Sequence, residues 1–97
     1  MEIKIKSLKF DADAKLIAYV EKKVSKLEKF FDGIETADVT LSLLSEPDNK
    51  NVKIQAHIPG DDLVIERSAK TFEEAVTEAA DLMKENIVRA KEKKFDK

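Results

Sequence analysis

The 97-residue sequence contains no cysteine, one histidine, two glycines and two prolines. Without cysteine the chain has no disulfides, no thiol chemistry and no sulfur ligands for zinc, which fits a reducing, cytoplasmic setting. No stretch approaches the roughly 20 apolar residues that a membrane-spanning helix needs. The N-terminal MEIKIKSLKF alternates charged and apolar residues, unlike a signal peptide. We therefore expect one cytoplasmic domain, residues 1–97, with no membrane association.

Candidate catalytic and metal-binding residues are also few. His57 is the only histidine, and it falls within an alternating apolar segment. If the alternation holds, its side chain points away from the predicted helices, and a solvated or partnered strand histidine is the simpler interpretation. The adjacent carboxylates of PGDD, residues 59–62, are better explained as turn formers than as a calcium site. No Ser/His/Asp set, His/Cys cluster or glycine-rich phosphate loop is present. The sequence therefore predicts no catalytic residues, no metal, no cofactor and no small-molecule substrate.

The hydrophobic periodicity predicts alternating strands and helices. Strands are expected over 3–10, 39–43, 52–58 and 63–69, and helices from Asp11 or Asp13 to about Asp32 and from about Phe72 to about Lys93. Both aspartates are candidate N-caps of the first helix, and Gly33 is expected as the left-handed residue beyond its end. The order β-α-β-β-β-α predicts an α+β fold. It is a two-layer sandwich in which a four-stranded mixed sheet carries both helices on one face.

The charges of the first predicted helix are sorted by sign, although the chain as a whole has a formal net charge of −2. That balance argues against indiscriminate nucleic-acid binding but allows a local basic face. At about 100° per residue, one flank of the helix carries Lys15, Lys22, Lys26 and Lys29, the shoulder carries Lys23, and the opposite flank carries Glu21 and Glu28. An ordinary solvated face and an anion-binding site both remain open, because so few charges can sort by chance.

The second predicted helix is acidic in its first half and basic at its end. The helix macrodipole explains part of this order. The lysines from Lys91 onward exceed what capping requires, and they follow most of the apolar anchors. If both helices cover one sheet face, the two basic regions can meet across the groove between them, and such a groove would follow a phosphate backbone.

Two stretches, VEKKVSKLEKFFDGI and TFEEAVTEAADLMKENIVRAKEKK, together with the element order, resemble the short ribosome hibernation-promoting factors and the related ribosome-associated inhibitor. Older usage calls this the sigma-54 modulation protein family. The resemblance covers essentially the whole chain, and KLEKFF is its most specific piece. It implies a fold like that of double-stranded-RNA-binding domains with an added N-terminal strand.

The resemblance also implies a function. Such proteins bind the small ribosomal subunit and its rRNA in the channel for mRNA and tRNA, silence translation in stationary phase or stress, and promote ribosome hibernation. A ribosome-dimerising helper protein is a further partner that stays open.

The basic positions of the family fall on Lys23, Lys26 and Lys29 in the first helix and on Leu82, Glu85, Arg89 and Lys93 in the second. Leu82 and Glu85 depart from the pattern, the first by being apolar and the second by reversing the sign. The expected RNA-binding residues are Lys22, Lys23, Lys26, Lys29, Arg89, Lys91, Lys93 and Lys94.

Two other functions remain as alternatives. The first is a protein-interaction module that modulates a transcription factor, with Glu21 and Glu28 facing a basic partner. The second is a small enzyme that uses PGDD and His57, and it is the weakest of the three.

Overall fold

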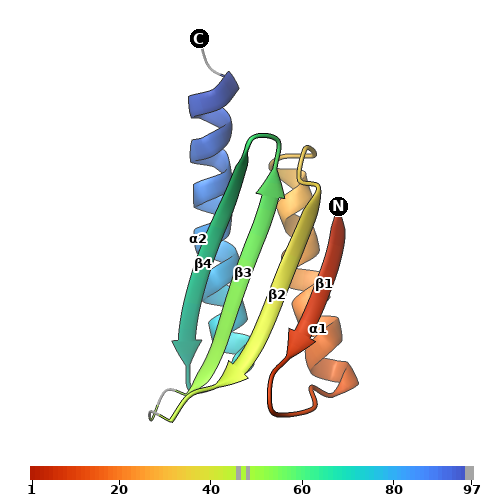
Figure 1. Cartoon of the computed structure of the whole chain (residues 1–97), viewed down its shortest axis with the longest axis vertical. Coiled ribbons are helices and arrows are strands. Elements are labelled where there is room, and N and C mark those ends of the chain that lie inside the picture. The colour runs from red at the N-terminus through yellow and green to blue at the C-terminus, as the bar shows by residue number, and fades with distance from the viewer. Residues whose placement is uncertain (46, 48, 96–97) are drawn as a thin grey trace.

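The computed structural model describes residues 1–45, 47 and 49–95, with side chains described up to residue 92. Its elements, shown in Figure 1, are β1 (Glu2–Ser7), α1 (Ala14–Ser25), a short 3₁₀ helix η1 (Lys26–Lys29), β2 (Thr36–Leu43), β3 (Lys50–Ile58), β4 (Asp61–Ala69) and α2 (Phe72–Phe95). The strands form one sheet in the order β1-β2-β3-β4. β1 runs parallel to β2, and the other neighbours are antiparallel. The predicted α+β fold with a mixed sheet is confirmed.

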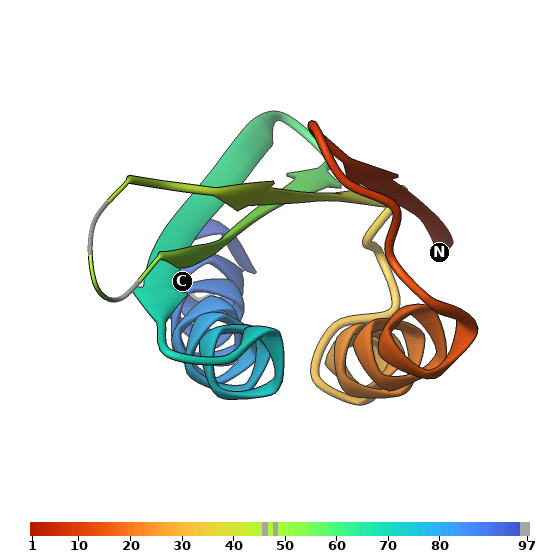
Figure 2. The same ribbon diagram turned by 90° about the horizontal axis from the view of Figure 1, so that it is seen from below.

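Both helices cover the same face of the sheet, as the end-on view in Figure 2 shows. The strand register explains why this face is apolar. Ile5 is paired with Val39, Val39 with Ile54, and Ile54 with Ile65, so one row of aliphatic side chains crosses all four strands. Residues on the helices complete this core, among them the fully buried Val20, Val24, Val76, Met83 and Ile87. Neither helix of the described residues combines the length and apolar character needed to cross a membrane.

Side-chain caps mark the start of each helix. Asp13 is the N-cap of α1, where its Oδ1 accepts a hydrogen bond of 2.8 Å from the backbone N–H of Leu16. At α2 the hydroxyl of Thr71 accepts a 3.1 Å hydrogen bond from the backbone N–H of Glu74. Each contact satisfies one of the N–H groups that a helix leaves unpaired in its first turn. The structure thus resolves the ambiguity between Asp11 and Asp13.

The end of the first helix differs from the prediction. The α-helix ends at Ser25, seven residues before the expected Asp32, and continues as the tighter turn of η1. The backbone N–H of Phe30 bonds to the carbonyl of Leu27 at 3.1 Å, which is the i→i+3 pattern of a 3₁₀ turn. The prediction of a left-handed Gly33 was wrong, since Lys9 and Gly60 are the described residues with positive φ.

Gly33 instead lies close against the ring of Phe31. A Cβ built on Gly33 would lie 2.5 Å from Cζ of Phe31, whose half-buried ring packs against the core. Such a contact is closer than two carbon atoms tolerate. Any side chain at this position would have to displace the ring of Phe31, which folds back over the backbone of Gly33.

The first strand is also shorter than predicted. It ends at Ser7, and Lys9 turns the chain with a φ of 66°. As a result Leu8 is exposed, while the ring of Phe10 leaves the strand direction and stacks on Phe72, with the ring centroids 5.0 Å apart. This contact fixes the loop that enters α1 against the first turn of α2.

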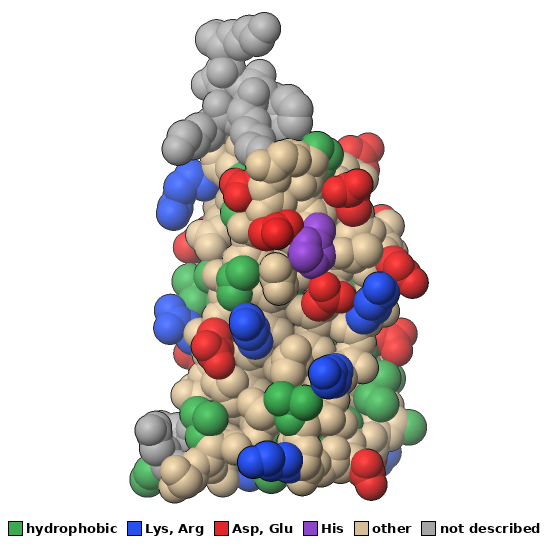
Figure 3. All heavy atoms as spheres, in the orientation of Figure 1, with side chains coloured by type: hydrophobic (Ala, Val, Ile, Leu, Met, Phe, Trp, Pro, Cys, Tyr) green, Lys and Arg blue, Asp and Glu red, His purple; other side chains and the backbone are tan. Residues whose placement is uncertain are grey.

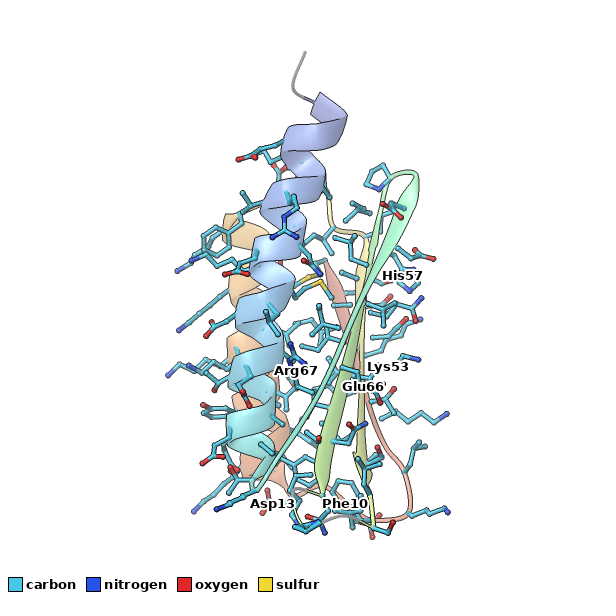
Figure 4. All side chains as sticks on the ribbon, turned by 90° about the vertical axis from the view of Figure 1, so that its left-hand side faces the viewer. Phe10, Asp13, Lys53, His57, Glu66 and Arg67 are labelled. Atoms are coloured by element: carbon cyan, nitrogen blue, oxygen red, sulfur yellow. The ribbon has the colours of Figure 1, made fainter. Side chains whose placement is uncertain are left out.

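The outer face of the sheet, which the helices leave uncovered, carries a three-residue polar cluster centred on His57. Figure 3 shows the histidine beside acidic side chains, and Figure 4 labels His57 on this face. His57 Nε2 lies 2.9 Å from Oδ2 of Asp38 on β2, and Nδ1 lies 2.7 Å from Oδ1 of Asp62 on β4. Both ring nitrogens can donate to carboxylates only when the imidazole is protonated. The hydrogen bonds to Asp38 and Asp62 accordingly raise the pKa of His57 above its ordinary value of 6.5. The prediction that His57 is a partnered strand residue pointing away from the helices is confirmed.

The cap assignment gives a direct test. Asp13→Ala should lower the free energy of unfolding by about 1 kcal/mol, because the N–H of Leu16 loses its acceptor. Asp11→Ala is the matched control, since it removes an exposed aspartate two residues away, and it should change the stability by less than about 0.5 kcal/mol. Urea denaturation of both variants measures the difference. Equal losses would contradict the assignment of Asp13 as the cap.

The His57 cluster predicts a pH dependence. Because its pKa is raised in the folded state, the protonated cluster stabilises the fold fully below the unfolded value of 6.5, and this contribution is lost as the pH rises through the folded pKa. The stability difference between the wild type and His57→Gln should therefore be larger at about pH 5.5 than at about pH 8.5. Urea denaturation at both pH values measures it. A difference that does not change with pH would show that the charge of His57 plays no part.

Candidate nucleic-acid interface

The predicted RNA-binding residues come from three helical segments. Lys22 and Lys23 lie on α1, Lys26 and Lys29 form the two ends of η1, and Arg89 and Lys91 lie on α2. All are exposed except Lys23, which is half-buried. Lys93 and Lys94 fall in the last turn of α2, outside the described side chains, so their predicted contribution is not placed.

The two helices run side by side in the same direction. Tyr19 on α1 meets Thr77 on α2 through a 2.9 Å hydrogen bond between their hydroxyls, and further along, Phe30 meets Lys84. The Thr77 hydroxyl already donates to the carbonyl of Glu73 at 2.8 Å, so the hydroxyl of Tyr19 is the donor in the link between the helices. This link holds the helices at a fixed spacing and leaves a groove on either side of it.

The basic part of this groove, which we call the lysine groove, has a volume of about 190 Å³. It is lined by Lys23, Lys26, Leu27, Phe30, Ala80, Asp81 and Lys84. The structure thus brings Lys23 and Lys26 of the predicted set together with Lys84, which was outside that set. Lys22, Lys29, Arg89 and Lys91 do not line it.

The change to a 3₁₀ turn aligns the side chains of two predicted lysines, Lys26 and Lys29. Side chains three residues apart eclipse one another on a 3₁₀ helix, whereas they diverge on an α-helix. Lys26 and Lys29 are three residues apart and both belong to η1. They therefore project in closer alignment than the α-helical prediction gave, and of the two Lys26 lines the groove.

Aromatic rings hold two of the lysines in the groove. The ammonium of Lys84 lies 4.6 Å from the ring centroid of Phe30, and that of Lys23 lies 5.5 Å from the ring centroid of Tyr19. Both distances are within the range of cation–π attraction. Sequence reasoning missed Phe30 and Lys84 as a pair. The available signal was that Phe30 falls outside the apolar stripe of Leu16, Val20, Val24, Leu27 and Phe31.

The remaining surface of α2 is mixed in sign. Arg89 lies beside Lys84, Glu85, Val88 and Glu92 along one side of the helix, so the acidic Glu85 stands between basic neighbours. Leu82 is half-buried and shares a shallow hollow with Arg67 of β4 and with Glu78 and Asp81. The two positions that depart from the family pattern therefore present no positive charge of their own.

The charge of the residues that line the groove changes from positive to negative along its length. Past the Tyr19–Thr77 link, toward the start of α2, it is lined by Glu73, Glu74 and Glu78. Acidic residues at the start of a helix are favoured by its macrodipole, which accounts for this end without a ligand. The charge of these glutamates disfavours an anion in this part of the groove. Among the described residues, no three His, Cys, Asp or Glu side chains are grouped as metal ligands.

Comparison with known proteins agrees with this architecture. The ribosome hibernation promoting factor of Azotobacter vinelandii is 26% identical over 97 residues, which span all of this chain and 89% of that protein. The crystal structure of the N-terminal domain of Thermus thermophilus Protein Y matches with a TM-score of 0.82 and 27% identity, over 93% of this chain and 99% of that one. A ribosomal subunit interface protein from Coxiella burnetii shares the fold, with a TM-score of 0.85 at 16% identity over 94% and 98% of the two chains.

The sequence model for the family described as Sigma 54 modulation protein / S30EA ribosomal protein matches residues 3–94, which is nearly the whole chain. The resemblance expected from KLEKFF and the element order is therefore confirmed, and the chain belongs to this family.

Proposed function

We propose that this protein binds the small ribosomal subunit in its channel for mRNA and tRNA and silences translation there without catalysis. It would act in the cytoplasm and promote ribosome hibernation in stationary phase or stress. The observation that carries this proposal is the lysine groove, where Lys23 and Lys26 meet Lys84. The name of one relative, the ribosome hibernation promoting factor of Azotobacter vinelandii, points the same way.

The charge state of the lysines supports binding to RNA phosphates. Among the described residues the ion pairs are those of the Met1 amine with Glu28 and of His57 with Asp38 and Asp62. None of the groove lysines is therefore neutralised by a carboxylate, and their ammoniums are available to an external anion. Phosphate oxygens are suitable partners, because charge-assisted hydrogen bonds to them are short and strong.

The negative net charge of the chain makes the proposed binding selective for one site on the RNA. Non-specific attraction to RNA depends on overall positive charge, which a protein with a formal net charge of −2 does not have. The acidic part of the groove repels a phosphate backbone that approaches in the wrong position. A particular arrangement of rRNA phosphates is thus favoured over RNA in general.

A protein-interaction module that modulates a transcription factor is the second candidate, and the family description itself names sigma-54 modulation. Its expected contact residues, Glu21 and Glu28, are both exposed. Glu28 is also 3.6 Å from the Met1 amine, which leaves less of its charge for a partner. Affinity purification that recovers a polymerase subunit and no ribosomal RNA would support this candidate over ribosome binding.

Charge reversal on η1 tests the proposed interface. The double variant Lys26→Glu/Lys29→Glu should bind small subunits at least about tenfold more weakly, a change of about 1.4 kcal/mol, while remaining folded because both side chains are exposed. Cosedimentation with purified subunits measures the binding, and circular dichroism measures the fold. The matched control is Lys6→Glu/Lys70→Glu, which reverses two exposed lysines away from the groove. Equal binding by both variants and the wild type would contradict the assignment.

The proposal also predicts a salt dependence. If about five side chains contact phosphates, a plot of log affinity against log salt should have a slope of about −3.5 to −4.5. Titration of labelled protein with small subunits at several potassium chloride concentrations gives this slope. An affinity that does not respond to salt would rule out phosphate contacts as the main source of binding.

A further inference from the structure

The wall of the lysine groove that η1 provides ends in an aromatic ring. Phe30 is the C-cap of η1, and its ring is half-exposed and lines the groove, whereas the neighbouring Phe31 packs against the core. Above the ring of Phe30 lies the ammonium of Lys84, which projects from α2. This contact joins the two helices at a point where no hydrogen bond between them is made by the described side chains.

The contact orders Lys84 without removing its charge. A carboxylate partner would hold the ammonium but neutralise it, while an aromatic face holds it through the ring quadrupole and leaves the positive charge in place. A lysine side chain that is ordered before binding loses less conformational freedom when it meets a ligand. Lys23 is held in the same way over Tyr19, and the ring of Tyr19 is itself anchored by its hydrogen bond to Thr77.

The lining of the groove is therefore suited to a single phosphate group. Lys23 and Lys26 supply two positive charges from the α1–η1 side, Lys84 supplies one from α2, and Asp81 opposes them with one negative charge. A volume of about 190 Å³ is enough for one phosphate group. Leu27 and Ala80 form the apolar part of the lining, where water competes less with the ammoniums.

We propose that the groove binds one phosphate of the rRNA backbone between Lys23, Lys26 and Lys84, and that Phe30 positions Lys84 for this contact. The inference rests on the proposed function and goes further, because it adds Lys84 as a contact residue and Phe30 as a positioning residue. It also implies that Asp81 weakens binding, whereas the lysines strengthen it, since this carboxylate repels the bound phosphate.

Equilibrium binding of the full-length chain to purified small subunits tests the contact. Lys84→Gln should weaken binding about three- to tenfold and make the salt slope shallower by about one unit, as expected for one lost phosphate contact. Asp81→Asn should tighten binding. Lys53→Gln is the matched control, because Lys53 is an exposed lysine on the outer sheet face, seen pointing away from the helices in Figure 4. It should leave affinity and slope unchanged.

A double-mutant cycle tests the role of Phe30. Phe30→Leu should weaken binding about two- to fivefold in the wild-type background, the loss expected for one cation–π contact, and Phe30→Tyr should retain binding. In the Lys84→Gln background, Phe30→Leu should have no further effect, because the residue it positions is absent. If the ring has only a structural role, Phe30→Leu will lower the affinity equally in both backgrounds. That result would overturn the proposal that Phe30 positions Lys84.

The outcomes separate this inference from the proposed function. If the wild type binds and Lys26→Glu/Lys29→Glu does not, while Lys84→Gln behaves like Lys53→Gln, the phosphate site is wrong and the proposed function stands. If the wild-type chain fails to bind small subunits at all, both are overturned.

Discussion

The helical surface depends on the burial of one apolar face of the sheet. The row from Ile5 to Ile65 runs across four strands, and two helices are needed to cover it. Because α1 leads from β1 to the parallel strand β2, and α2 follows β4, the helices lie side by side over opposite halves of the sheet. The groove between them is a consequence of this arrangement, which brings Lys23, Lys26 and Lys84 together.

Within that frame, the tightening of the chain at Lys26 determines which side chains reach the groove. An α-helix continued to Asp32 would have spread the lysines over a broad flank. The 3₁₀ turn instead aligns Lys26 with Lys29 and turns the ring of Phe30 toward α2. After this turn Phe31 packs against the core, with its ring close to the backbone of Gly33.

The sequence was most informative where a local pattern is tied directly to a face of the fold. Alternation along β2 and β3 predicted their buried faces, and the position of His57 in that alternation predicted that it points away from the helices. The lysine flank on the first helix was predicted from helical angles alone, and the family from KLEKFF and the element order. In each case the relevant contacts are close in sequence or repeat with the period of the element.

The remaining features depend on contacts between distant segments. Asp11 and Asp13 are equivalent as candidate caps, and only the geometry of the first turn distinguishes them. The length of the α-helix was overestimated because no proline or glycine marks the change at Lys26. The pairing of Phe30 with Lys84 joins residues on separate helices. Spacing could mark Phe30 as lying outside the apolar stripe, but it could not identify Lys84 as its partner. Contacts between side chains of different elements can therefore be identified only from the structure.

The common direction of the two helices has a chemical consequence. The N-terminal ends, where free backbone N–H groups attract anions, lie together with Asp13 and Thr71 as their caps. Lys23, Lys26 and Lys29 lie at the other end of α1, where free carbonyls disfavour an anion. Main-chain groups there do not assist the capture of a phosphate, so the positive potential comes from primary amines alone. A surface of this kind is open to control by any chemistry that neutralises lysine, such as N-acylation, without a change in the backbone.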